Sequence, residues 1–204
     1  MQRPGKIICV GRNYAAHAKE LGNEVPKEPL LFFKPPTSVI SAGTAIELPP
    51  GAGRVDFEGE IGVVIGATLR HVDEATARAG IRSLIAANDV SSRDWQNSDG
   101  QWARAKGCDT FLPLGLEAPV PADFDAVTLV TRHNGVEKQR ATGADMVFKI
   151  PFLLAHISKY MTLEPGDLLL TGTPAGVAQL APGDTVEIEL VGLSSVKNPV
   201  AAGR

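Results

Sequence analysis

The sequence predicts a β-rich α+β fold with few, short helices. The chain of 204 residues contains 21 glycines and 15 prolines, which divide it into short segments. Many of these segments are short apolar runs, which are typical of strands. The turn Asn134–Gly135 lies between two such runs and is the strongest hairpin signal in the chain. A bundle of helices would not tolerate so many prolines.

The first half of the chain predicts three strands and two short helices. Apolar runs between glycines and prolines predict strands at 6–10, 30–33 and 59–66. A helix is expected at 14–21, ended by Gly22, and another at 73–79, with acidic residues in its first turn. The run 81–89 remains open between strand and helix, because short apolar runs cannot be separated by their period.

The second half predicts a hairpin, one longer helix and two closing strands. The hairpin consists of strands at 127–133 and 136–141. The longest helix is expected at 147–160, with Pro151 in its first turns, where proline does least harm. Closing strands are predicted at 167–171 and 185–190, and each follows a Pro-Gly-Asp turn. These elements predict one domain over 1–204.

Composition narrows the classes of partner. The chain is 44% apolar and 21% charged, with a net charge of −3, and no Lys/Arg cluster suggests a nucleic-acid partner. No apolar run is long enough to predict a membrane span, and no signal peptide is recognisable, so a cytoplasmic protein is expected. Cys9 and Cys108 are too few for a disulfide framework and fit a reduced compartment.

Three carboxylates form the main candidate site. Glu58 and Glu60 lead into a predicted strand, where residues two apart point to the same face. Like charges this close repel each other, and a divalent cation between them would remove the conflict. Asp89 offers a third oxygen after its own apolar run. Such a set suits Mg²⁺, Mn²⁺ or Ca²⁺ rather than zinc. The alternative is that both glutamates face solvent on an edge strand.

A histidine and a glutamate form a second candidate. His17 and Glu20 lie three apart on a predicted helix, so they share a face and can form a hydrogen bond. A histidine oriented by a carboxylate is a common general base. The alternative is a solvated amphipathic helix.

Two further features could bind an anion. Lys106 could neutralise an anionic substrate or a developing enolate, although a surface lysine is the commoner interpretation. The run 170–176 leads from a strand into a glycine-rich turn, which could present backbone N–H groups and a hydroxyl to a carboxylate. The alternative there is a plain tight turn.

Taken together and in this order, these motifs resemble the fumarylacetoacetate hydrolase superfamily, in particular its short acylpyruvase branch. The matching segments span nearly the whole chain: Val10-Gly11-Arg12-Asn13-Tyr14, Phe33-Lys34-Pro35, Glu58-Gly59-Glu60-Ile61, Asn88-Asp89-Val90, Arg93-Asp94, Lys106-Gly107 and Leu170-Thr171-Gly172-Thr173-Pro174.

The resemblance implies a fold, a metal and a set of site residues. The fold would be a mixed β-roll and the protein a homodimer. Mg²⁺ or Mn²⁺, with Ca²⁺ as a substitute in crystals, would be bound by Glu58, Glu60 and Asp89. A 2-oxo acid substrate would be held by Arg12, Gln96, Lys106 and Thr173. His17 and Glu20 would belong to a mobile lid and form a water-activating pair, with Lys106 supplying positive charge nearby.

The implied reaction is metal-dependent hydrolysis of a C–C bond in 2,4-dioxo acids, acylpyruvates such as fumarylpyruvate or acetylpyruvate, through a pyruvate enolate. Oxaloacetate decarboxylation and isomerisation of the 2-hydroxyhepta-2,4-diene-1,7-dioate type are alternatives, because one site can serve all three reactions. A non-catalytic binding relative and a metal-independent β-domain are further alternatives. An assay with 2,4-dioxo acids would distinguish the enzyme from the binder, and metal content would identify the metal-independent case.

Overall fold

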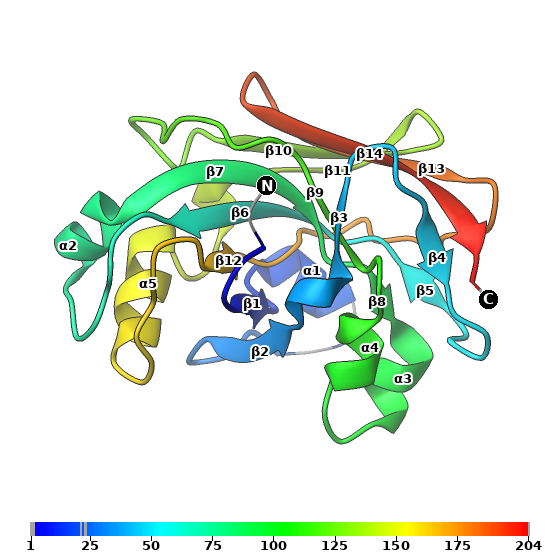
Figure 1. Ribbon diagram of the computed structural model, residues 1–204, viewed down its shortest axis with the longest axis horizontal. Helices are drawn as coiled ribbons and strands as arrows, with labels where there is room; N and C mark the ends of the chain where they lie inside the picture. The colour runs from blue at the N-terminus through cyan, green and yellow to red at the C-terminus, as the bar shows by residue number, and fades with distance from the viewer. Residues whose placement is uncertain (1–2, 21, 23, 204) are drawn as a thin grey trace.

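A computed structural model describes residues 3–20, 22 and 24–203 of the protein. Its larger sheet mixes parallel and antiparallel strands in the order β2-β1-β12-β6-β7-β9-β3 (Figure 1). These strands are β1 (Ile7–Gly11), β2 (Leu30–Lys34), β3 (Val39–Ser41), β6 (Gly59–Ile65), β7 (Ile81–Asn88), β9 (Leu112–Leu114) and β12 (Leu168–Leu170).

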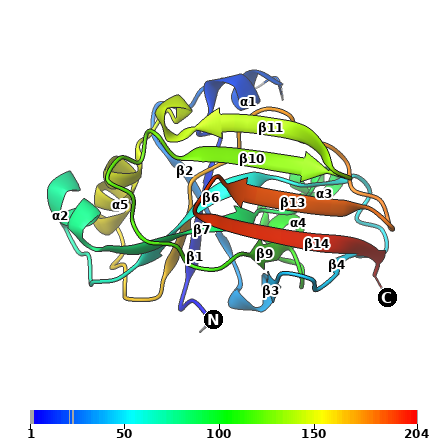
Figure 2. The ribbon, with the colours of Figure 1, turned by 90° about the horizontal axis from the view of Figure 1, so that it is seen from above.

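A second sheet lies across the first, with its strands in the order β11-β10-β13-β14-β4, as Figure 2 shows from above. Its strands are β4 (Ile46–Leu48), β10 (Thr128–His133), β11 (Val136–Thr142), β13 (Thr185–Leu190) and β14 (Ser194–Ala202). A short antiparallel pair, β5 (Val55–Asp56) and β8 (Ser91–Ser92), stands apart from both sheets.

The helices are short and lie around the sheets. In Figure 1, α2 and α5 lie at one end of the molecule and α3 and α4 at the other. The helices are α1 (Ala15–Glu20), α2 (Glu74–Ala79), α3 (Arg93–Ser98), α4 (Ala103–Gly107) and α5 (Ile150–Ser158), with 3₁₀ turns η1 (Pro36–Ser38) and η2 (Gly143–Asp145). None of the helices in the described part of the chain is both long and apolar enough to cross a membrane.

The core lies between the two sheets and inside the curl of the larger one. Ile61 of β6 shares the main apolar cluster with Leu129 and Ile188 of the second sheet. A smaller cluster on the other face of the larger sheet includes Ile7, Cys9 and Ile85. Phe32 on the first strand of that sheet and Val39 on its last both pack against this cluster, so the sheet curls round on itself. The predicted β-rich α+β class, with few short helices, is confirmed.

Most predicted elements are present, and the ambiguous run is resolved. Residues 81–88 form β7, which pairs with β6 along its length. The predicted hairpin is confirmed as β10 and β11, joined at Asn134–Gly135, where both residues have positive φ. Both cysteines are free.

The predicted helix at 147–160 is too long at both ends. The structure places α5 at 150–158, with Pro151 in its first turn. Asn13 explains the late start, because its side chain accepts from the Phe148 N–H at 2.7 Å and donates to the Phe148 carbonyl at 3.0 Å. The same amide donates to the Thr171 carbonyl at 2.8 Å. This segment is therefore held in extended form against the ends of β1 and β12.

The sequence predicted that the strand at 185–190 would be the last strand of the fold, and this prediction is wrong. The nine-residue strand β14 follows it and pairs with β13 and β4. Its buried residues alternate with exposed ones, but two of the buried ones are the polar Ser194 and Asn198, and Pro199 interrupts the apolar pattern. The helices α3 and α4 were not predicted either.

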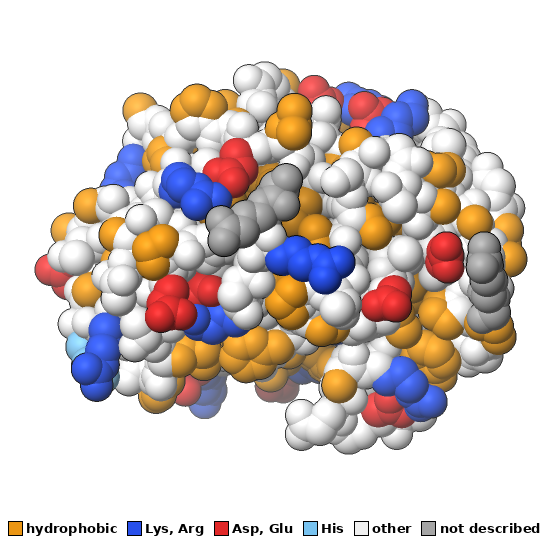
Figure 3. All heavy atoms as spheres, viewed as in Figure 1, with side chains coloured by type: hydrophobic (Ala, Val, Ile, Leu, Met, Phe, Trp, Pro, Cys, Tyr) orange, Lys and Arg blue, Asp and Glu red, His pale blue; other side chains and the backbone are white. Residues whose placement is uncertain are grey.

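Charged side chains of both signs are interspersed with apolar ones on the face drawn in Figure 3. This mixture is consistent with the small net charge of −3.

Candidate active site

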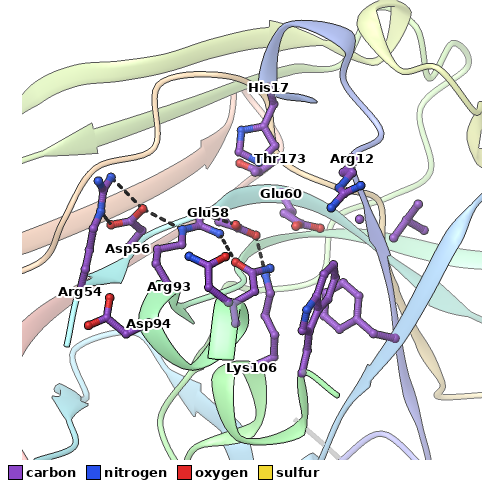
Figure 4. Close-up of a pocket in the computed structure, with 16 residues that line it drawn as sticks. Arg12, His17, Arg54, Asp56, Glu58, Glu60, Arg93, Asp94, Lys106 and Thr173 are labelled. Atoms are coloured by element: carbon purple, nitrogen blue, oxygen red, sulfur yellow. Dashed lines mark hydrogen bonds and ion pairs between the residues drawn. The ribbon is translucent and has the colours of Figure 1, made fainter. Parts of the chain in front are cut away.

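The predicted site residues meet at one cavity of about 520 Å³ (Figure 4). Glu20 and Asp89 do not line it, but each contacts a residue that does: Glu20 contacts His17, and Asp89 contacts Lys106. The remaining predicted residues line the cavity, and they come from five parts of the chain: Arg12, His17, Glu58, Glu60, Gln96, Lys106 and Thr173.

The three predicted metal ligands form one buried cluster. A carboxylate oxygen of Glu58, of Glu60 and of Asp89 can be chosen so that all lie within 4.8 Å of one another. The hairpin β6–β7 produces this arrangement, because the Asp89 N–H donates to the Glu58 carbonyl at 2.8 Å. Glu58 and Glu60 are 4% and 1% exposed, and β6 lies between two other strands. These exposures exclude the alternative in which both glutamates face solvent on an edge strand.

Glycine separates the two glutamates for a steric reason. A Cβ at Gly59 would overlap the hydroxyl of Thr131 on β10. The Gly59 N–H donates to the side-chain oxygen of Gln139 at 3.0 Å. The second sheet therefore packs directly against the backbone between Glu58 and Glu60, and both glutamates line the cavity.

Cationic side chains already compensate two of the carboxylates. Lys106 Nζ lies 2.8 Å from both Glu58 Oε2 and Asp89 Oδ2. Lys34 Nζ, fully buried, lies 2.7 Å from Asp89 Oδ1. Burial would raise the pKa of Glu58, but Lys106 and Arg93 outweigh it and lower that pKa below its usual range. Burial would likewise lower the pKa of Lys106, and its two carboxylate partners raise it instead.

Glu60 lacks such compensation, and this observation tests the fit of a metal. The one hydrogen bond to its carboxylate from the described residues is the Gly172 N–H at 2.7 Å. Burial, followed by the charges of Asp89 and Glu58, raises its pKa well above the usual value. A divalent cation would remove this conflict, and three carboxylate oxygens are the donors that Mg²⁺ and Mn²⁺ prefer. The residues present therefore fit a hard divalent cation.

The predicted base, His17, lines the cavity and contacts its predicted partner, Glu20. His17 is 4% exposed, and its Nδ1 lies 3.1 Å from Glu20 Oε2. The other Glu20 oxygen, Oε1, accepts from the Gly176 N–H at 3.0 Å. In Figure 4, His17 points down from α1 toward Glu58 and Glu60. The burial of His17 rules out the alternative of a solvated helix for this residue.

The run 18–29 is predicted to be a lid, and hydrogen exchange would test this prediction. The run is polar and charged, and α1 ends at Glu20; residues 21 and 23 lie outside the described residues. Amide exchange across 14–28 should slow when Mg²⁺ and oxalate are both added, because a bound ligand would hold α1 and the run that follows it over the cavity. The β10–β11 hairpin provides the internal reference. Equal protection with and without oxalate would mean that the segment is static.

Sequence reasoning missed an arginine pair beside the cluster. Asp56, fully buried, accepts from Arg54 Nε and from Arg93 Nε, each at 2.8 Å. Arg93 also lies 2.7 Å from Glu58 Oε1 through Nη2. Arg93 lies inside a matching motif but had no assigned role, whereas Asp56 and Arg54 lie outside the matching segments. Lys34 likewise lies in a matching motif but had no assigned role.

A family model and several known proteins match nearly the whole chain. A family model described as fumarylacetoacetate (FAA) hydrolase C-terminal matches residues 6–201. A mitochondrial oxaloacetate tautomerase of Arabidopsis thaliana is 42% identical, over 94% of this chain and 89% of the relative. A mitochondrial oxaloacetate decarboxylase of Dictyostelium discoideum is 41% identical, over 93% of this chain and 90% of the relative.

A solved structure shows the same fold. It is a 5-carboxymethyl-2-hydroxymuconate delta-isomerase from Mycobacterium smegmatis, with a TM-score of 0.91 and 44% sequence identity. The match covers 99% of this chain and 80% of the other.

Proposed function

The chain belongs to the fumarylacetoacetate hydrolase family, and on that premise we propose that it is a divalent-cation-dependent tautomerase of 2-oxo dicarboxylic acids such as oxaloacetate. The names of its relatives support this reaction class. One relative is named for tautomerising oxaloacetate, another for decarboxylating it, and the solved structure for isomerising a hydroxymuconate. Tautomerisation and isomerisation both move a proton within the substrate. The names therefore favour the alternatives over acylpyruvate hydrolysis, which the sequence put first.

One observation carries the proposal: a buried histidine with a defined tautomer faces the carboxylate cluster. Glu20 is close to His17 only at Nδ1. A carboxylate can only accept, so in the neutral imidazole Nδ1 carries the hydrogen and Nε2 keeps its lone pair. The lone pair is then available to take a proton from a ligand in the cavity.

The proposed reaction needs one proton and no co-reactant. His17 Nε2 takes the proton from C3 of the keto acid and returns it to the C2 oxygen, so atoms and charge balance. A divalent cation held by Glu58, Glu60 and Asp89 would supply positive charge that stabilises the negative charge developing on that oxygen. Arg12 lines the cavity and could pair with a carboxylate of the substrate.

The direct test is the decay of enol-oxaloacetate, followed by its ultraviolet absorbance with purified protein and Mg²⁺. The decay should accelerate with Mg²⁺ and return to the uncatalysed rate after treatment with EDTA. Oxaloacetate decarboxylation, acetylpyruvate and fumarylpyruvate should be assayed in parallel. Turnover of an acylpyruvate faster than that of enol-oxaloacetate would overturn the proposal.

Replacing His17 should affect proton transfer most. His17→Ala should slow tautomerisation by about a hundredfold to ten-thousandfold, the usual contribution of general acid–base catalysis. It should slow decarboxylation less, because that reaction needs no proton abstraction from C3. The matched control is His133→Ala, since His133 also pairs with a carboxylate, Asp184, at 2.8 Å but does not line the cavity. Equal losses in both activities would make His17 a lid or binding residue.

Acylpyruvate hydrolysis is the second candidate. The same His17–Glu20 pair that could abstract a proton from carbon could also deprotonate a water molecule. The panel of substrates above distinguishes the two reactions.

A further inference from the structure

We propose that Gln139 is a positioning residue that makes the Thr173 hydroxyl a hydrogen-bond donor toward an anionic oxygen of the substrate. This inference rests on the proposed function only in that it requires an acidic ligand in the cavity. Gln139 lies on β11 and is 1% exposed, so its contacts are with protein groups.

The orientation of the Gln139 amide is fixed by two backbone groups. Its Oε1 accepts from the Gly59 N–H at 3.0 Å, and its Nε2 donates to the Pro174 carbonyl at 2.7 Å. A backbone N–H only donates and a backbone carbonyl only accepts. Exchanging the oxygen and nitrogen of the amide would break both bonds, so one orientation is possible.

That orientation decides the role of Thr173. The second hydrogen of Gln139 Nε2 points to Thr173 Oγ1 at 2.8 Å. The amide nitrogen can only donate, so the hydroxyl oxygen must accept and its own hydrogen must point elsewhere. Thr173 lines the cavity, and Gln139 is the one hydrogen-bond partner of its hydroxyl among the described residues. The hydroxyl hydrogen is therefore available to a ligand.

The turn that carries Thr173 is fixed to the metal cluster and to β11. The residue before it, Gly172, donates to Glu60 at 2.7 Å. At the end of the turn, Gly176 has φ +102°, and a Cβ there would overlap the Lys138 carbonyl. The Thr173 hydroxyl thus lies beside the carboxylate cluster, in a fixed register with Gln139. Carboxylate and oxo oxygens only accept hydrogen bonds, so a fixed donor favours them over ligand groups that donate.

Replacing the Gln139 amide by a carboxyl group should reverse the direction of its hydrogen bond with the Thr173 hydroxyl. The amide has two hydrogens and serves both Pro174 and Thr173. The carboxyl of Gln139→Glu has at most one hydrogen, which the Pro174 carbonyl takes. The Thr173 hydroxyl then donates to the carboxyl and is lost to the ligand. The contact with the Gly59 N–H is retained, so Gly59 and the glutamates beside it keep their support.

The test is oxalate binding with Mg²⁺, measured by titration calorimetry on the full chain. Thr173→Val should weaken oxalate binding about tenfold or more, the usual effect of losing a hydrogen bond to a charged group. Gln139→Glu should weaken it by a similar factor. In the Thr173→Val background, Gln139→Glu should add less than about a twofold loss, because the hydroxyl it acts through is gone. Affinity for Mn²⁺ should stay unchanged in all variants.

The inference and the proposed function would be overturned by different results. Unchanged oxalate binding in Gln139→Glu, or losses that multiply in the double variant, would make Gln139 merely structural. If Gln139→Glu does not fold, Gln139→Met replaces it in the same double-mutant cycle. If Gln139→Met still weakened oxalate binding in the Thr173→Val background, the inference would be overturned. Failure of the unmodified protein to bind oxalate would instead overturn the proposed function.

Discussion

Replacing Glu60 by glutamine should abolish binding of the divalent cation and, with it, turnover, while the protein stays folded. Among the described residues, the Glu60 carboxylate accepts one hydrogen bond, from the Gly172 N–H, which the amide oxygen of glutamine can also accept. The substitution removes a buried negative charge that Asp89 and Glu58 oppose. Loss of residues that merely support metal ligands weakens binding about 10- to 100-fold, so loss of a ligand should weaken it further.

The measurement is titration of the EDTA-treated protein with Mn²⁺, together with the oxaloacetate assay and a thermal melt. Glu164→Gln is the matched control, because Glu164 lies at the surface beside Lys6. Metal binding and the melting temperature should stay unchanged in that variant. Full activity of the original protein after exhaustive EDTA treatment would rule out the metal site altogether.

Replacing Asp89 should destabilise the protein as well as remove a metal ligand. Asp89 is fully buried and neutralises two buried lysines, Lys34 and Lys106, at 2.7 and 2.8 Å. Its removal leaves two buried ammonium groups with less compensating negative charge. Breaking a buried ion pair in this way typically costs about 3–5 kcal/mol of stability. Asp89→Ala should therefore unfold at much lower urea concentration than Glu60→Gln.

The comparison should be made in EDTA, so that metal binding does not contribute to the stability of either variant. Asp99→Ala is the control, since Asp99 pairs with the exposed Arg104 at the surface and its loss should change stability little. If Asp89→Ala and Asp99→Ala had the same urea midpoint, the buried lysines would not depend on Asp89.

The grouping of the three carboxylates follows only in part from local pattern. The side chains of Glu58 and Glu60 share a face because of the period of a strand, whereas the position of Asp89 beside them depends on the pairing of β7 with β6, which the sequence left open. The fold class followed from short apolar runs and the turn at Asn134–Gly135.

What the sequence did not predict depends on contacts between distant segments. Lys34 ends β2 and Asp89 follows β7, and nothing local indicates that they meet. Asn13 shortens the predicted helix at 147–160 from 135 residues away. The role proposed for Gln139 likewise needs the register between β11 and the turn that carries Thr173. Strand β14 escaped prediction because its pairing with β13 and β4 decides its conformation more than its own composition does.

The position of β1 between β2 and β12 has a consequence for synthesis. Ile7 pairs with Leu168 in the parallel ladder, so β1 is made long before its partner strand. At about 5–20 residues per second, the delay is roughly 10–30 s. Until then β1 and β2 form at most an isolated hairpin, which is marginally stable in water. The antiparallel pair β6–β7, which brings together the three candidate metal ligands, is complete much earlier. Strand β1, whose Ile7, Ile8 and Cys9 are fully buried in the finished fold, is therefore the segment that a chaperone would need to shield longest.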